Sequence, residues 1–231
     1  MAIFNQDQPI STSVITESSA VQSSFLQKVY GLFLLGLITA FGGAVVTMTN
    51  PQVLALVGTH PIIGVIVYFG VFFLCMAVRR TPGVNILALL AFTLVSGAFI
   101  APTILYAAFQ TGSMAVVYEA AIVTGSIFVG LTLYTFISKK DFSFLSGVVT
   151  IGIFAVIGIM IVNFFVKSAA ADLAISWIGS VLFSLFILYD TSRIMRTHES
   201  DEYVSGALSL FLDFINLFLF ILRILSSGRR N

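Results

Sequence analysis

Two aspartates lie deep inside long apolar stretches of this sequence. Asp190 occurs in LFSLFILYDTSRIM and Asp213 in LSLFLDFINLFLFILRIL. An ionisable group in hydrocarbon costs several kcal/mol, so it has to face the interior of a helix bundle, find a partner or carry a proton. Carboxyl groups in such positions can bind cations or exchange protons, which makes these two residues the candidate functional site.

The composition indicates that the surrounding medium is a lipid bilayer. Of the 231 residues, 58% are hydrophobic and only 9% are charged, whereas about a quarter of the residues of a soluble domain are charged. The mean hydropathy of +1.07 agrees with this. We therefore predict an all-α integral membrane protein. The formal net charge is only +1, so no basic excess points to a nucleic-acid partner.

Polar breaks divide the chain into an N-terminal tail and seven apolar segments. Residues 1–27 are rich in Ser, Thr and Gln, which predicts a flexible cytoplasmic tail. A helix that crosses a bilayer needs about 20 mostly apolar residues. The segments that qualify are 29–49, 61–78, 84–107, 114–137, 143–165, 173–195 and 205–225. Residues 28–231 are thus expected to form a single domain of seven transmembrane helices.

The positions of the basic residues predict the orientation in the membrane. With seven spans, one side contains Lys28, Arg79, Arg80, Lys139, Lys140, Arg193 and Arg196, and the opposite loops contain only Lys167. This asymmetry places the N-terminus in the cytoplasm. Arg229 and Arg230 conflict with it, because they would lie outside. We favour a full seventh span with a short translocated tail over a last segment that enters the membrane and returns.

The two aspartates are expected to lie at nearly the same depth. They belong to consecutive antiparallel spans, with Asp190 roughly 8 Å and Asp213 roughly 12 Å from the cytoplasmic ends of their helices. Neighbouring helix axes pack about 8–10 Å apart, so the two carboxyl groups meet if the helix faces agree. Two carboxylates in a low dielectric do not easily both ionise, and such a pair would hold one proton between them.

Each aspartate also has a polar neighbour on its own helix, which offers a purely structural explanation. Arg193 follows Asp190 by three residues and Asn216 follows Asp213 by three, so each pair shares a helical face. An Asp–Arg pair alone would only hold helices together. A third carboxylate, Glu119, lies near the outer start of the fourth span, where it can reach water, and both a structural and a functional role stay open for it.

The sequence lacks the common motifs of enzymes and of metal sites. His60 and His198 have no second His or Cys at metal-ligand spacing, and there is no Walker-type loop, HExxH or GxSxG. We expect no enzymatic activity and no cofactor.

Three segments resemble the transmembrane Bax-inhibitor-motif family, in particular its bacterial members. They are YDTSRI around Asp190, LSLFLDFINLFLFILRIL around Asp213, and FVGLTLYTFISKKDFSFLSG at the end of the fourth span. The likeness runs from about Tyr30 to Arg223 through all seven spans, and LDFINLF is highly specific.

This resemblance implies a fold in which six helices wrap around the seventh, and a function as a pH-sensitive calcium leak channel. Asp190 and Asp213 would be the pH sensor and the transient ligands of Ca²⁺. A basic residue that closes the second span would latch to the pair in the shut state. Arg79 fits this position best, and Arg80 is the alternative.

A pair of carboxylates suits weak, passing coordination of calcium. Tight calcium sites use about six to eight oxygen ligands, and few other acidic groups lie nearby. Weak binding is what permeation requires. Protonation would remove both the ligands of the cation and the acceptors of the latch, so the sequence leaves the sign of the pH response open.

Two other functions stay open. A proton-coupled cation transporter would use the same aspartates as a proton relay, although the spans have no evident inverted repeat of the kind many transporters carry. A regulatory protein would instead bind a membrane AAA protease or cell-death factors through its surface. We expect a monomer in a bacterial cytoplasmic membrane, with an organelle membrane as the alternative.

Overall fold

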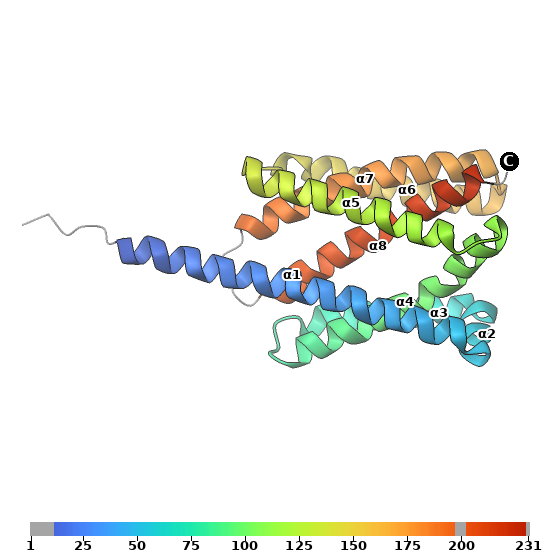
Figure 1. The fold of residues 1–231 in the computed structure, drawn as a ribbon, viewed down its shortest axis with the longest axis horizontal. Helices are drawn as coiled ribbons and strands as arrows, with labels where there is room; N and C mark the ends of the chain where they lie inside the picture. The colour runs from blue at the N-terminus through green and yellow to red at the C-terminus, as the bar shows by residue number, and fades with distance from the viewer. Residues whose placement is uncertain (1–11, 197–201, 230–231) are drawn as a thin grey trace, which may run out of the picture.

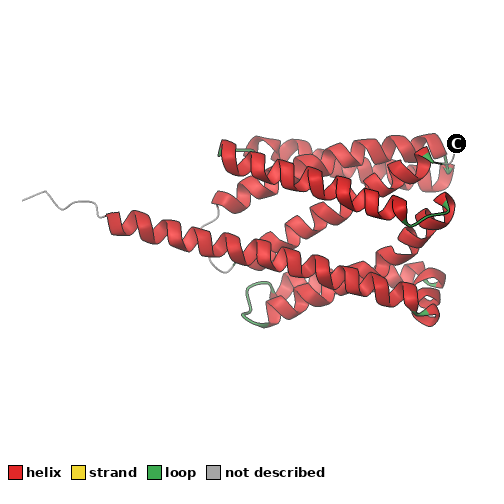
Figure 2. Ribbon diagram, in the orientation of Figure 1, coloured by secondary structure: helices red, strands yellow, loops and turns green. Residues whose placement is uncertain are grey.

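The computed structural model describes residues 12–196 and 202–229, which fold into helices joined by short loops (Figure 2). Within these two ranges there is no strand. The elements are α1 (Thr12–Thr49), α2 (Pro51–Thr59), α3 (Pro61–Val78), α4 (Val84–Thr111), α5 (Ala115–Ser138), the 3₁₀ helix η1 (Ser143–Leu145), α6 (Ser146–Val166), α7 (Ala169–Arg196) and α8 (Tyr203–Gly228).

Six of the described helices are long and apolar enough to cross a membrane: α1, α4, α5, α6 with the preceding η1, α7 and α8. A seventh crossing results if α2 and α3, which are bent by 95° relative to each other, count as one span. α3 coincides with the predicted segment 61–78 and has 18 residues. At about 1.5 Å per residue its length is about 27 Å, close to the bilayer core of about 30 Å.

The short helix α2 was not expected, because it lies between the first two predicted spans. Asn50 starts it by accepting hydrogen bonds from the backbone N–H groups of Gln52 and Val53 at 3.0 and 3.3 Å. Pro51 occupies the first helical position, where its missing N–H costs nothing. The Asn-Pro dipeptide therefore begins a helix rather than only ending one.

Helix α1 is longer than the first predicted span. It begins at Thr12, so residues 12–27 belong to a helix and not to a flexible tail, whereas residues 1–11 lie outside the described residues. Phe25 is buried, and the Gln22 side-chain amide donates a hydrogen bond to the carbonyl oxygen of Met195 at 2.5 Å. These contacts join the start of the helix to the end of α7.

α1 and α4 cross at close range because glycines face the opposing backbone. A Cβ atom on Gly97 would lie 1.8 Å from the carbonyl oxygen of Ala40, and one on Gly43 would lie 2.1 Å from that of Leu94. Neither approach is possible for any other residue. This is the small-residue packing that lets membrane helices approach each other without a hydrophobic driving force.

Helix α8 lies between two groups of helices (Figure 1). It packs against α7 and α5 on one side and against α1 and α4 on the other, while α3 packs on α4 and α6 on α7. Among the candidate spans α8 has the most buried window. The expectation that all six other helices surround the last one is therefore not confirmed, because α3 and α6 pack mainly on helices other than α8.

The last helix agrees with one of the two predicted courses of the C-terminal segment, the full span. α8 continues without a break from Tyr203 to Gly228 over 26 residues, about 39 Å at 1.5 Å per residue. A segment that enters the membrane and returns would need a turn inside this range. The continuous helix has the geometry of a full span.

Candidate functional site

Asp190 and Asp213 meet in the interior, between α7 and α8. Their exposed fractions are 7% and 3%, and the two carboxyl groups lie close enough to form a side-chain hydrogen bond. This contact was predicted from the matched depths of the two aspartates. It requires that both residues lie on the faces by which α7 and α8 pack together, and they do. A hydrogen bond between two carboxyl groups requires a proton on one of them, because a carboxylate is only an acceptor.

Arg193 lies next to this pair, nearer the C-terminal end of α7. Its Nη2 atom lies 3.1 Å from Oδ1 of Asp190 and donates to Oγ of Ser209 on α8, also at 3.1 Å. The guanidinium also lies over the ring of Tyr189. Arg193 therefore bridges α7 and α8, with half of its side chain exposed. Ser209 was not predicted, although it lies one helical turn before Asp213, on the same face of the helix.

A group of buried hydroxyls on three helices includes that of Thr191, the residue after Asp190. The Tyr30 hydroxyl lies near those of Thr132 and Thr191, and Thr191 directly follows Asp190 in α7. None of the three hydroxyls, nor Oδ2 of Asp213, forms a well-aligned hydrogen bond with the described residues. An unsatisfied buried polar group costs about 1–3 kcal/mol, so water or a cation beside any of these oxygens would be stabilised.

Other buried hydroxyls in the bundle are satisfied in a different way. Thr135 donates to the carbonyl oxygen of Leu131 at 2.9 Å, and Ser96 donates to that of Phe92 at 2.8 Å. Both bonds stay within one helix, as is usual for Ser and Thr in apolar helices. The hydroxyls of Tyr30, Thr132 and Thr191 lack such a bond, as do those of Thr124 and Ser205.

The predicted latch residues do not contact the aspartates in this structure. Arg80 pairs with Glu202 at the start of α8, with Nη2 and Oε1 2.7 Å apart. The Arg79 side chain makes no hydrogen bond or ion pair with the part of the chain that the structure describes, and only its carbonyl oxygen accepts one, from Asn85. Arg193 is the basic residue whose charge acts on both aspartates.

Glu119 and Asn216, the two other polar residues considered with the pair, bond to partners other than the aspartates. Glu119 forms a two-pronged ion pair with Nη2 of Arg229, at 2.7 and 2.6 Å. This contact joins the start of α5 to the end of α8 and was not predicted. The Asn216 side chain donates to the carbonyl oxygen of Leu212 within α8, at 2.7 Å, and not to Asp213.

The loop between α5 and η1 packs against the end of α7 near Arg193. Ser192 accepts a hydrogen bond from the backbone N–H of Phe142 at 3.1 Å, and Arg196 lies 3.5 Å from Asp141. The backbone N–H of Ser143 lowers the pKa of Asp141, so this ion pair persists at neutral pH and is lost as the pH falls through that lowered value. A cavity of about 220 Å³ lies between this loop and Arg193.

The site offers few ligands to a metal ion. No group of three or more His, Cys, Asp or Glu residues lies together among the described residues. The aspartate pair and the neighbouring hydroxyls contribute oxygen ligands, which suit hard cations such as Ca²⁺ but provide few of the negative charges of a tight calcium site. This arrangement favours brief coordination.

Comparison with known proteins identifies the family. The model of the family described as "Inhibitor of apoptosis-promoting Bax1" matches residues 22–230. The chain belongs to this family. This confirms the resemblance on which the expectations about the aspartates depend.

Relatives of this family member occur in bacteria and in eukaryotes. A membrane protein of Vibrio cholerae is 33% identical, over 96% of this chain and 100% of that protein. Bax inhibitor 1 of Schizosaccharomyces pombe is 32% identical, over 97% and 85%. Protein lifeguard 4 of Mus musculus is 31% identical, over 93% and 89%. Together with the apolar helices, these similarities establish a multi-pass membrane protein.

Proposed function

We propose that this protein is a pH-sensitive calcium leak channel, which acts as a monomer in a bacterial cytoplasmic membrane with its N-terminus in the cytoplasm. One observation carries the proposal: two buried carboxyl groups from consecutive helices, Asp190 and Asp213, lie in direct contact. Helix packing alone does not require two carboxyl groups at the centre of an apolar bundle, because small or apolar residues would pack there without a desolvation cost.

The pair combines a cation ligand with a proton sensor. With one proton, the two carboxyl groups carry a single negative charge, which Arg193 balances. Loss of that proton adds a negative charge, and the pair then attracts a divalent cation more strongly. The hydroxyls of Tyr30, Thr132 and Thr191 supply neutral oxygens in the same part of the bundle, so a passing Ca²⁺ ion keeps part of its oxygen coordination.

Arg193 is the better candidate for the latch than Arg79 or Arg80. It binds Asp190 and Ser209 together, and thus holds α7 and α8 against each other at the cytoplasmic end of the pair. Protonation of both carboxyl groups removes the negative charge that Arg193 binds and weakens the latch, whereas deprotonation strengthens the latch and the cation site alike. Flux that rises as the pH falls would mean that the latch dominates, and flux that rises with pH would mean that the charge of the site dominates.

A regulatory role is the second candidate, because two relatives bear the names Bax inhibitor 1 and lifeguard 4. A regulator acts through other proteins and carries no ion by itself. A proton-coupled transporter is the third possibility, since it would use the same aspartates.

Calcium flux into liposomes that contain only the purified protein separates these functions. A leak channel passes calcium without any partner, with a rate that does not saturate at moderate concentration and that differs between about pH 6 and pH 8. A transporter gives a saturating rate coupled to proton movement. Flux equal to that of empty liposomes at both pH values would contradict the proposal and favour a regulator.

A further inference from the structure

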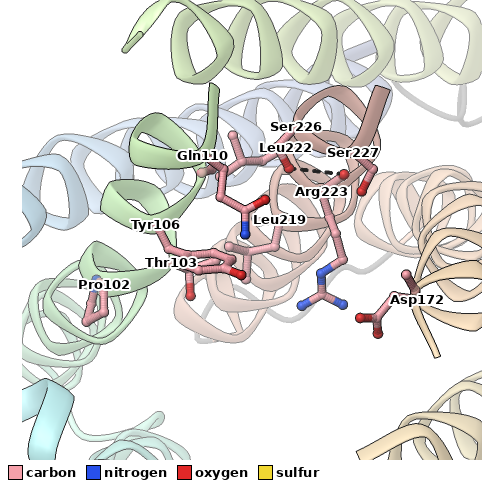
Figure 3. Close-up of a pocket in the computed structure, with 12 residues that line it drawn as sticks. Pro102, Thr103, Tyr106, Gln110, Asp172, Leu219, Leu222, Arg223, Ser226 and Ser227 are labelled. Atoms are coloured by element: carbon pink, nitrogen blue, oxygen red, sulfur yellow. Dashed lines mark hydrogen bonds between the residues drawn. The ribbon is translucent and has the colours of Figure 1, made fainter. Parts of the chain in front are cut away.

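A second polar region lies at the opposite end of the bundle from the aspartate pair. A cavity of about 560 Å³ is enclosed by the last turns of α4, the first turn of α7 and the end of α8. Figure 3 shows the side chains of Arg223 and Asp172 directed into the same open space. The cavity size is typical of sites for small molecules, which occupy about 300–1,000 Å³.

The two charged side chains in this cavity do not neutralise each other. No ion pair joins Arg223 to Asp172, and the Arg223 guanidinium makes no hydrogen bond with the described residues. Asp172 accepts one hydrogen bond, from the side-chain amide of Asn163 at 2.7 Å. A cation and an anion thus face one cavity and both have free bonding capacity.

The remaining lining of the cavity is divided into a polar part and an apolar part. Gln110, Ser226 and Ser227 provide amide and hydroxyl groups near the helix ends, and Leu219 and Leu222 form an apolar floor on α8. α4 and α7 both pack against α8 but not closely against each other, which leaves a cleft between them. The cavity therefore accepts a molecule with a polar head and an apolar part.

We infer that this cavity binds a phosphoethanolamine group, with its phosphate on Arg223 and its ammonium on Asp172. Guanidinium groups bind phosphate oxygens in paired hydrogen bonds, and a carboxylate is the matching acceptor for an ammonium group. A zwitterion neutralises both side chains at once, whereas a simple anion or cation leaves one of them unmatched.

The depth of the cavity favours a lipid as the source of this group. Arg223 lies five residues before the end of α8 and Asp172 in the first turn of α7, so both are within about 8 Å of the helix ends, where lipid headgroups lie. The same group also occurs in water-soluble phosphodiesters. The shared chemistry is the phosphoethanolamine group, and the experiment below separates the two sources.

The test uses the full-length protein and two soluble headgroups. Glycerophosphoethanolamine carries both charges and glycerophosphoglycerol only the negative one, and phosphorus NMR titration measures the binding of each. We expect the former to bind at least tenfold more tightly. Arg223→Gln and Asp172→Asn should each weaken it about tenfold, which corresponds to about 1.4 kcal/mol, and Arg223→Lys should restore part of the affinity.

The matched control is Arg229→Gln, which removes an arginine from the same end of α8 but from outside this cavity, and it should leave binding unchanged. Asp172→Asn keeps an oxygen for the hydrogen bond from Asn163, so the local fold is preserved. Equal affinity for the two headgroups, or full affinity in Asp172→Asn, would overturn the inference.

Native mass spectrometry of protein taken from nanodiscs identifies the source. The nanodiscs contain equal amounts of phosphatidylethanolamine and phosphatidylglycerol. Retention of phosphatidylethanolamine by the natural chain, and not by Arg223→Gln, assigns the site to a lipid. Binding of the soluble headgroup without lipid retention assigns it to a soluble phosphodiester. Failure of both to bind would contradict the site altogether, without bearing on the proposed calcium flux.

Discussion

Acidic residues and an arginine lie together at each end of the bundle, but the two groups differ in how deeply they are buried. At one end Asp190 and Asp213 are buried against each other, and one half-exposed arginine balances them. At the other end Glu119 and Arg229 form an ion pair at 2.6 Å, but their side chains are 46% and 41% exposed. Charged groups are thus in close contact at both ends, and burial is what differs.

This difference in burial determines what each pair can contribute. An exposed ion pair is screened by water and typically contributes less than about 1 kcal/mol. A buried pair of like groups is expensive unless it shares a proton, so its state depends on pH. The pair of Asp190 and Asp213, called the inner pair below, is suited to respond to protons. The pair of Glu119 and Arg229 is suited to add a small amount of stability.

The largest expected effect follows removal of the ionisable proton from the inner pair. Asp213→Asn keeps the shape and the hydrogen bonding of the side chain, so calcium flux in liposomes should lose its difference between about pH 6 and pH 8. Thermal stability in detergent should be equal to that of the natural chain or higher, because the desolvation of a potential charge is relieved.

A purely structural role for Asp213 gives the opposite result. If the aspartate mainly holds the helices in place through its hydrogen bond to Asp190, the same change weakens that buried contact and costs about 1–3 kcal/mol. A large fall in the unfolding temperature together with an intact pH response would contradict the proposed sensor.

The next largest effect concerns the latch. Arg193→Gln removes a charge-assisted hydrogen bond that bridges α7 and α8, and because the arginine is half exposed we expect a shift of about 1 kcal/mol in the gating equilibrium. This corresponds to about a fivefold rise in resting calcium flux. Arg79→Ala should change flux less, and Lys139→Ala not at all. If Arg79→Ala raises resting calcium flux more than Arg193→Gln does, Arg79 is the latch residue, as the family resemblance implies.

A smaller effect is expected from the hydroxyls beside the pair. Thr191→Val keeps the volume of the side chain and removes its hydroxyl. If the hydroxyl stabilises water or a cation, the variant should lose about 1 kcal/mol of stability, measured by thermal unfolding. A rise in stability would mean that the hydroxyl is only an unsatisfied group and plays no part in the site. Thr135→Val, which removes a hydroxyl bonded within its own helix, is the control.

The smallest effect is expected at the ion pair of Glu119 and Arg229. Glu119→Gln removes one charge of the exposed pair with Arg229, and the unfolding free energy should fall by less than about 1 kcal/mol. The pH response of calcium flux should stay unchanged, since this pair lies far along α8 from Asp213. A loss of the pH response in this variant would remove the functional distinction between the two ends.

Much of the helix arrangement could be predicted from the sequence. The membrane spans could be predicted from the long apolar segments, because a bilayer requires about 20 apolar residues per helix. The meeting of Asp190 and Asp213 followed from their matched depth. α2 was not predicted because nine residues are too few for a span. The start of α1 was not predicted because its polar composition is also typical of a flexible tail.

Contacts that depend on helix rotation could not be predicted. Tyr30, Thr132 and Thr191 are ordinary residues of apolar helices, and only the packing of α1, α5 and α7 brings them together. The pair of Glu119 and Arg229 joins residues 110 positions apart. Arg193 was recognised as a neighbour of Asp190 because three residues separate them in one helix, but its bond to Ser209 depends on how α8 packs.

The central claim is that the inner pair holds a proton, and infrared titration of the carboxyl C=O band tests it most directly. We predict that the natural chain shows a protonated carboxyl band that persists near about pH 6, and that this band is absent in Asp213→Asn. Glu119→Gln should retain the band. If all carboxyl groups of the natural chain instead titrate near the reference value of about 3.9 to 4.3, the pair shares no proton and the account of the site is wrong.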